Sequence, residues 1–149
     1  MNQPPVFSHY QTRDLLDNTS TEMLLSTDLG LTTSPVKRTD KGWAFPDGQV
    51  LTFNQIQWIN ENENGCFHFQ NGEIQKVEAF SRVTDRYYSL MPTPKAPTLL
   101  ISGIPMHRIK DTTPVEDTHQ KIKALGKPYG CILDTATGLG YTAIQAAKT

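Results

Sequence analysis

The chain has 149 residues, of which 37% are hydrophobic and 19% are charged, and its formal net charge at pH 7 is −1. This composition is typical of a folded protein and excludes a disordered chain or a strongly basic nucleic-acid-binding one. The sequence has no apolar run long enough to span a membrane, and its first residues lack the basic start and apolar core of a signal peptide. We therefore expect a cytoplasmic protein without a membrane partner.

The start of the chain is polar and contains the pair Pro4-Pro5. Because no apolar period is sustained there, residues 1–21 are predicted to form a flexible tail. The first strand is predicted at Glu22–Thr27, and the Ser34-Pro35 pair marks a break after it.

Two hairpins are predicted from their turn residues. Apolar residues on both sides of Pro46-Asp47-Gly48 indicate the first, and a helix with an apolar face is expected at residues 53–60. The second joins strands at residues 66–70 and 73–80 through Asn71-Gly72, a pair that favours a type I′ turn. Further strands are expected at residues 86–91 and 98–101, so residues 22–103 are predicted to form a small, mainly antiparallel β domain.

The pattern changes after residue 103. Thr113-Pro114-Val115-Glu116 combines an N-cap, an early proline and a capping-box glutamate, which predicts a helix as far as Leu125. A short apolar strand at residues 130–134 and a helix at residues 141–148 follow. Strand, glycine turn and helix are typical of an α/β nucleotide-binding unit, so residues 104–149 are predicted to be a linker helix and the start of such a domain.

The two cysteines, Cys66 and Cys131, are far apart, and each lies in an apolar stretch. We expect reduced thiols in the core. His107, Asp111, Asp117 and His119 do not have the spacing of metal ligands, so no metal is predicted.

The segment that carries chemistry runs from Ile132 to Tyr141, ILDTATGLGY. An acidic residue closes the apolar stretch, and Gly138 and Gly140 then lead into a helix. Glycine lets the backbone approach a ligand closely. The pattern resembles motif I of the class I S-adenosylmethionine-dependent methyltransferases, although Ala136 occupies the position of the motif's first glycine. The resemblance implies that the cofactor-binding residues are Asp134, Thr135, Ala136, Gly138, Gly140 and Tyr141.

A wider resemblance covers residues 24–147 and is densest in APTLLISGIPMHRIKDTTPVEDTHQKIKAL (Ala96–Leu125), followed by CILDTATGLGYTAI. These segments are similar to a family of predicted methyltransferases known mainly from archaea and related in fold to spermidine synthases. The resemblance implies an α+β chain in which a β domain precedes the first strand, turn and helix of a Rossmann-like domain. It also makes Met106, His107, Arg108 and Asp117 candidates for the pocket entrance, whereas Glu116 is chiefly a capping residue.

A complete methyltransferase domain needs further parallel strands and an acidic residue for the cofactor ribose, which we do not find after the glycine turn. We therefore expect a truncated, N-terminal part of the enzyme that is inactive alone and binds S-adenosylmethionine weakly or not at all. A second chain or a homo-oligomer could complete the site, and the methyl acceptor is unknown.

Two alternatives remain open. The β domain could be a non-catalytic module that binds RNA or protein, with Phe67, Phe69, Tyr87 and Tyr88 as a stacking platform, although few basic residues accompany them. The chain could also be part of an aminopropyltransferase of the polyamine-synthase type, which shares the fold.

Overall fold

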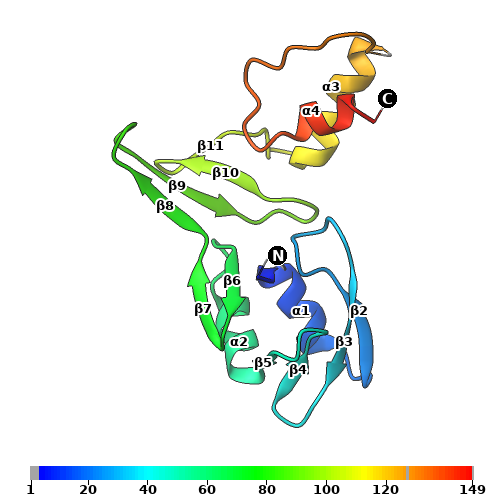
Figure 1. The fold of residues 1–149 in the computed structure, drawn as a ribbon, viewed down its shortest axis with the longest axis vertical. Coiled ribbons are helices and arrows are strands. Elements are labelled where there is room, and N and C mark those ends of the chain that lie inside the picture. Colours follow the sequence, from blue (N-terminus) through cyan, green and yellow to red (C-terminus); the bar gives the residue numbers. More distant parts are fainter. Residues whose placement is uncertain (1–3, 127, 149) are drawn as a thin grey trace. The chain divides into compact units, whose positions relative to one another are not determined.

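The structure is a computed structural model that describes residues 4–126 and 128–148. The chain forms two compact units, which we describe separately (Figure 1). One consists of the residues up to Glu78 together with Leu90–Pro92, and the other of Ala79–Ser89 and the residues from Thr93 onward. This division falls within residues 78–93, whereas the predicted boundary follows residue 103.

In chain order, the helices and strands of the described residues are β1 (Val6–Phe7), α1 (His9–Asp17), β2 (Glu22–Leu25), β3 (Ser34–Arg38), β4 (Gly42–Ala44), β5 (Val50–Thr52), α2 (Phe53–Glu61), β6 (Phe67–Gln70), β7 (Glu73–Lys76), β8 (Glu78–Ser81), β9 (Arg86–Met91), β10 (Thr98–Ile101), β11 (Ile104–Pro105), α3 (Pro114–Leu125) and α4 (Tyr141–Ala146). The strand pairs are antiparallel, and the predicted α+β class with antiparallel sheets is confirmed.

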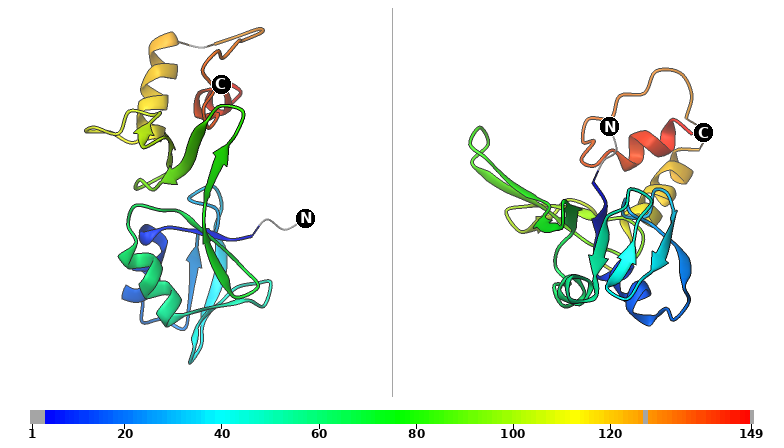
Figure 2. Two further views of the ribbon diagram at one scale, coloured as in Figure 1. Left: turned by 90° about the vertical axis from the view of Figure 1, so that its left-hand side faces the viewer. Right: turned by 60° about the horizontal axis from the view of Figure 1, so that its bottom comes forward.

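The first unit contains two antiparallel sheets, ordered β1-β6-β7 and β2-β3-β4-β5, and helices α1 and α2, which lie side by side (Figures 1 and 2). The predicted hairpin at Asn71-Gly72 is confirmed. The strands pair from Phe67↔Lys76 to Gln70↔Glu73, and both turn residues have positive φ, 54° and 81°, as a type I′ turn requires. The hairpin around Pro46-Asp47-Gly48 and the helix after it are confirmed as well.

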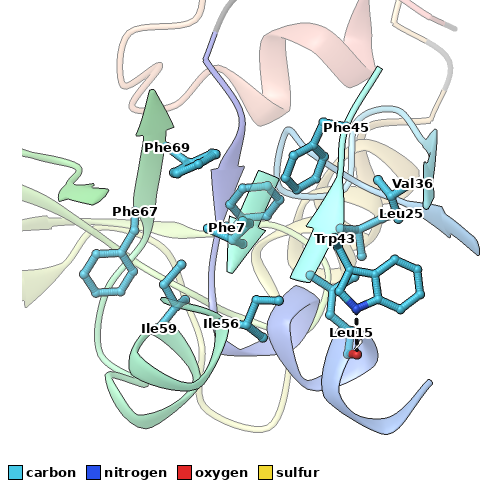
Figure 3. Packing of buried hydrophobic residues seen from close by; sticks show 11 residues of the cluster. Phe7, Leu15, Leu25, Val36, Trp43, Phe45, Ile56, Ile59, Phe67 and Phe69 are labelled. Atoms are coloured by element: carbon cyan, nitrogen blue, oxygen red, sulfur yellow. Dashed lines mark hydrogen bonds between the residues drawn. The ribbon is translucent and has the colours of Figure 1, made fainter. Parts of the chain in front are cut away.

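The core of the first unit is built from large side chains of both sheets and both helices (Figure 3). Trp43 is fully buried, and its indole Nε1–H donates to the carbonyl oxygen of Leu15 at 3.2 Å. Phe67 and Phe69 also belong to this core, with 3% and 1% of their surfaces exposed. Because these rings are buried, the four-aromatic stacking platform considered for a binding module does not form.

The prediction of a flexible tail over residues 1–21 is wrong for the described residues. Residues 6–7 pair with β6, and α1 follows. Ser8 caps this helix in a capping box with Gln11, while Phe7 and Leu15 are buried in the core. The tail therefore folds because a few well-placed residues bury one side of a mostly polar segment.

The expected strand over residues 73–80 is divided into β7 and β8 around Val77. The backbone of Val77 bonds to two different partners, since its N–H donates to Cys66 O at 2.8 Å and its carbonyl accepts from Leu90 N at 3.3 Å. This junction lets β7 remain in the first unit's sheet while β8 pairs with β9 in another sheet.

The second unit contains helices α3 and α4 and the sheet ordered β11-β10-β9-β8. A few residues of β8 and β9 belong to the first unit instead. Figure 2 shows β8 and β9 as a long twisted ribbon (green). Helix α3 begins and ends as predicted: Thr113 and Glu116 form a capping box, and Gly126 at the C-cap has φ 78°. Helices α3 and α4 pack against each other, and residues 128–140 form a long loop between them (Figure 1).

The predicted strand at residues 130–134 is not formed, since this segment pairs with no strand of the described residues. Ile132 and Leu133 are 54% and 85% exposed, and Cys131 is exposed rather than buried. A strand depends on neighbours that are distant in sequence, so the apolar pattern alone does not create one. Cys66, in contrast, is buried as predicted.

The two thiols are expected to differ in reactivity. Burial raises the pKa of Cys66 to about 12, so its reactive thiolate is scarce at pH 8, whereas Cys131 is exposed. Iodoacetamide at pH 8 should therefore modify Cys131 at least about a hundredfold faster than Cys66, measured by peptide mass spectrometry. The Cys131→Ser variant should show no fast-reacting thiol. Equal labelling rates in the native protein would contradict the packing described for both residues.

Candidate ligand-binding site at the glycine turn

The glycine turn lies in the second unit and leads into α4. Gly138 and Gly140 have φ values of 54° and 79°, which other residues rarely adopt. The N–H of Gly140 donates to the carbonyl of Thr137 at 2.7 Å, and Gly140 is the N-cap of α4. The turn is thus a tight loop in which the two glycines fill positions that disfavour side chains.

Asp134, at the start of the turn, holds it in shape through two hydrogen bonds. Its carboxylate accepts the Thr142 hydroxyl at 2.7 Å and the Ala136 N–H at 3.1 Å. These two hydrogen bonds, the one from Thr142 above all, lower the pKa of Asp134. In this structure Asp134 is therefore an ionised residue that ties the start of the turn to the first turn of α4.

His107 reaches the glycine turn because of a hairpin between β10 and β11 that was not predicted from the sequence. Strands β10 and β11 pair as Leu100↔Pro105 and Ile101↔Ile104, around Ser102 and Gly103, which both have positive φ. If the same antiparallel register continues, His107 lies opposite Thr98, the first residue of β10.

The imidazole of His107 is held on two sides. Its Nδ1 lies 3.0 Å from the hydroxyl of Thr98, which also accepts the backbone N–H of His107 at 3.3 Å. Its ring lies against that of Tyr141, with centroids 5.1 Å apart, and the Tyr141 hydroxyl donates to Pro97 O at 2.8 Å. Burial lowers the pKa of His107, Lys121 lowers it further and Asp117 opposes this, so the ring is mainly neutral at pH 7.

The Nε2 edge of the His107 ring faces Gly138. A Cβ atom placed on Gly138 would lie 3.6 Å from Nε2 and 3.9 Å from Cε1 of the ring. A side chain at residue 138 would therefore occupy the space between the turn and the imidazole. With glycine there, that space remains open to a ligand.

A cavity of about 410 Å³ lies at this place, within the usual range for small-molecule sites. Its walls come from β10, the chain after β11, α3, the glycine turn and α4. The lining residues are Leu99, Ile101, Met106, His107, Asp117, Thr118, Lys121, Ala136, Thr137, Gly138, Tyr141 and Thr142.

The structure brings most of the predicted site residues together in this cavity, namely Met106, His107, Asp117, Ala136, Gly138 and Tyr141. Arg108 is exposed and does not line it. Asp134 and Thr135 line a neighbouring open cavity of about 520 Å³, and Gly140 lines neither.

Several residues of the site are not predicted from the sequence, among them Thr137 and Thr142 of the lining, Lys121 and Thr98. Lys121 pairs with Asp117, its Nζ 2.6 Å from Oδ2, and the spacing of four residues on one helix was the available signal. Thr98 orients His107, but nothing in the sequence marks it, because the contact depends on strand register.

The neighbouring cavity is mainly apolar. Leu125, Leu133 and Ala143 contribute to its lining, and Leu125 is 74% exposed. Within residues 4–126 and 128–148, no three His, Cys, Asp or Glu side chains gather as metal ligands. None of the helices described is long and apolar enough to cross a membrane.

The sequence matches no family model. It is 40% identical over 141 residues to an uncharacterized protein of Methanocaldococcus jannaschii. The match covers 91% of this chain and 47% of that protein, so the chain spans about half the length of the curated relative it matches.

Proposed function

We propose that this chain is part of an S-adenosylmethionine-dependent methyltransferase and that its glycine turn is the part that contacts the cofactor. The observation that carries the proposal is the cavity beside Gly138, where the missing side chain leaves open space between the turn and His107. A ligand that lies against the backbone of the turn requires such a position. The cavity also combines apolar and polar walls, as small-molecule sites do.

The residues present fit the cofactor in their chemistry. Ionised Asp134 fixes the turn through Thr142 and Ala136, so the backbone of residues 136–138 has its shape before a ligand arrives. The hydroxyl of Thr137 and the ring of Tyr141 line the same cavity. S-adenosylmethionine, when bound, supplies an electrophilic methyl group on its sulfonium, and these residues hold and orient it.

We also propose the finer fold that this function needs. In a Rossmann-like domain, residues 130–134 would form the first parallel strand, and neighbouring strands would cover Ile132 and Leu133. Their exposure of 54% and 85% in this chain supports the idea of a covering segment, which another part of a longer protein or a second chain would supply. The chain alone is then expected to bind the cofactor only weakly.

Binding at the turn is testable by titrating the ¹⁵N-labelled chain with S-adenosylhomocysteine, the demethylated form of the cofactor. Amide resonances of residues 134–141 and of His107 are expected to shift in fast exchange, with a dissociation constant of about 1 mM, because only one wall of the site is supplied. No shift at these residues at 10 mM would contradict the proposal. Tight binding would show that the site is more complete than we infer.

A matched pair of glycine variants separates ligand contact from backbone strain. Gly138→Ala and Gly126→Ala both place a side chain at positive φ, 54° and 78°, but only the first places a methyl group in the cavity. We expect Gly138→Ala to weaken binding by about tenfold or more, which corresponds to about 1.4 kcal/mol, and Gly126→Ala to leave it unchanged. Equal effects of the two variants would contradict the proposal that the ligand contacts the glycine turn.

A further inference from the structure

The cavity beside the glycine turn contains a nearly buried carboxylate. Asp117 lies near the start of α3 and is only 7% exposed, although its side chain contributes to the cavity wall. An ionised carboxylate loses hydration when it is buried, and it requires a partner of opposite charge or several hydrogen-bond donors. The identity of that partner determines what the cavity can bind.

The partner seen here is Lys121, whose Nζ lies 2.6 Å from Asp117 Oδ2. The Lys121 side chain is 61% exposed, whereas that of Asp117 is 10% exposed. The lysine therefore reaches a buried anion from solvent with a long, flexible chain. Ordering the lysine loses rotamer entropy, and its ammonium is well hydrated when it turns away, whereas the buried carboxylate still needs a cation beside it.

We propose that the cavity binds its ligand through a protonated amine, which takes the place of the Lys121 ammonium at Asp117. The exchange preserves the neutralisation of Asp117 and returns Lys121 to water. The inference rests on the proposed function, for which it names the methyl acceptor as a molecule that carries an alkyl ammonium group as its anchor at Asp117.

The other walls of the cavity agree with this class of ligand. Leu99, Ile101 and Met106 offer apolar surface to a carbon chain. Two further titratable side chains line the cavity, the Tyr141 phenol and the imidazole of His107, and His107 is mainly neutral at pH 7 because burial lowers its pKa. Once Lys121 has moved away, Asp117 gives the cavity a negative charge, which favours a cation over a neutral or anionic ligand.

The probe for this inference is n-hexylamine at pH 7, added to the ¹⁵N,¹³C-labelled chain without cofactor. We expect the Asp117 carboxyl carbon and the amides of Thr118 and Ile122 to shift, with a millimolar dissociation constant, because the probe is small. The isosteres n-hexanol and hexanoate should bind at least about tenfold more weakly. Equal binding of hexanol would overturn the inference, since it would show that the apolar walls alone account for binding.

The lysine variants test the exchange directly. Lys121→Gln removes the internal competitor and is expected to tighten hexylamine binding by about two- to fivefold, because the Asp117 carboxylate is then left to the probe. Lys123→Gln, on the same helix but outside the cavity lining, should leave binding unchanged. A merely structural ion pair predicts no tightening, so unchanged binding in Lys121→Gln overturns the proposal.

The carboxylate variants complete the set. Asp117→Asn should abolish the preference for hexylamine over hexanol. Glu116→Gln is its control, because Glu116 has a separate partner in Lys95 at 3.1 Å and Gln can keep the capping box. If Asp117→Asn does not fold, the lysine variants still decide the question.

The two proposals fail independently. Shifts at residues 134–141 with S-adenosylhomocysteine but no amine selectivity would keep the methyltransferase and remove the amine acceptor. Amine selectivity without S-adenosylhomocysteine binding would leave an amine-binding cavity and remove the methyltransferase.

Discussion

Replacing Trp43 by alanine is expected to lower the free energy of unfolding of the first unit by about 3–5 kcal/mol. Trp43 is fully buried at the centre of the core, and alanine would leave a large cavity among β4, β5 and α1. The indole also donates to Leu15 O, so the variant leaves a buried carbonyl without this donor. Urea denaturation followed by far-ultraviolet circular dichroism measures the loss.

The second tryptophan supplies the control. Trp58 lies on α2, is 47% exposed and packs edge-on against Phe67 with ring centroids 5.1 Å apart. Removing it should lower stability by only about 1 kcal/mol, because much of its surface already faces solvent. Similar losses for the two variants would contradict the position of Trp43 at the centre of the core.

Several features of this fold follow from local sequence signals. Asn71-Gly72 specifies its own turn, because both residues tolerate the positive φ that a type I′ hairpin requires. Thr113 and Glu116 likewise fix the start of α3 by satisfying free backbone N–H groups. These interactions span only a few residues, so the sequence alone is sufficient to predict them.

Helix α1 was predictable from a signal that the composition obscured. Ser8 and Gln11 have the spacing of a capping box, and both of its hydrogen bonds form. The surrounding residues are polar and the buried face is made by His9, Thr12 and Leu15, so the usual apolar stripe is weak. The cap was therefore better evidence than hydrophobic periodicity for this segment.

Contacts in the candidate site that depend on strand pairing could not be predicted from local sequence signals. The resemblance identified His107 and Asp117 as pocket residues, and both line the cavity at the glycine turn. It could not supply the hydrogen bond between Thr98 and His107, because that contact depends on the register of β10 and β11. Residues 130–134 show the same limit, since parallel pairing depends on strands far away in sequence.

The geometry also indicates what the proposed site would need in order to enclose a ligand. His107 is fixed by Thr98 and Tyr141, and the turn is fixed by Asp134, so the wall beside Gly138 is already ordered. The side lined by Leu125 and Leu133 is open and apolar. A covering segment there would exclude water from the ligand, which strengthens polar contacts within the cavity.

Gly42→Ala is expected to destabilise the first unit by about 3 kcal/mol, through a steric clash between two neighbouring strands. A Cβ atom on Gly42 would lie 2.0 Å from Leu51 O and 2.7 Å from the Cα of Thr52. Both obstacles are backbone atoms, so a change of side-chain rotamer cannot relieve the contact, and β4 and β5 must separate.

The consequence extends beyond the hairpin, because Thr52 caps α2 and Leu51 is fully buried. Gly48→Ala, in the turn of the same hairpin, is the matched control. Gly48 has φ 87° and no atom within 4 Å of its added Cβ, so alanine there should cause only the backbone strain of about 1–2 kcal/mol. Urea denaturation of both variants gives their free energies of unfolding, and the difference between the two losses measures the effect of the steric clash beyond that of backbone strain. A loss for Gly42→Ala no larger than that for Gly48→Ala would contradict the close approach of β4 and β5, since the clash is what distinguishes the two positions.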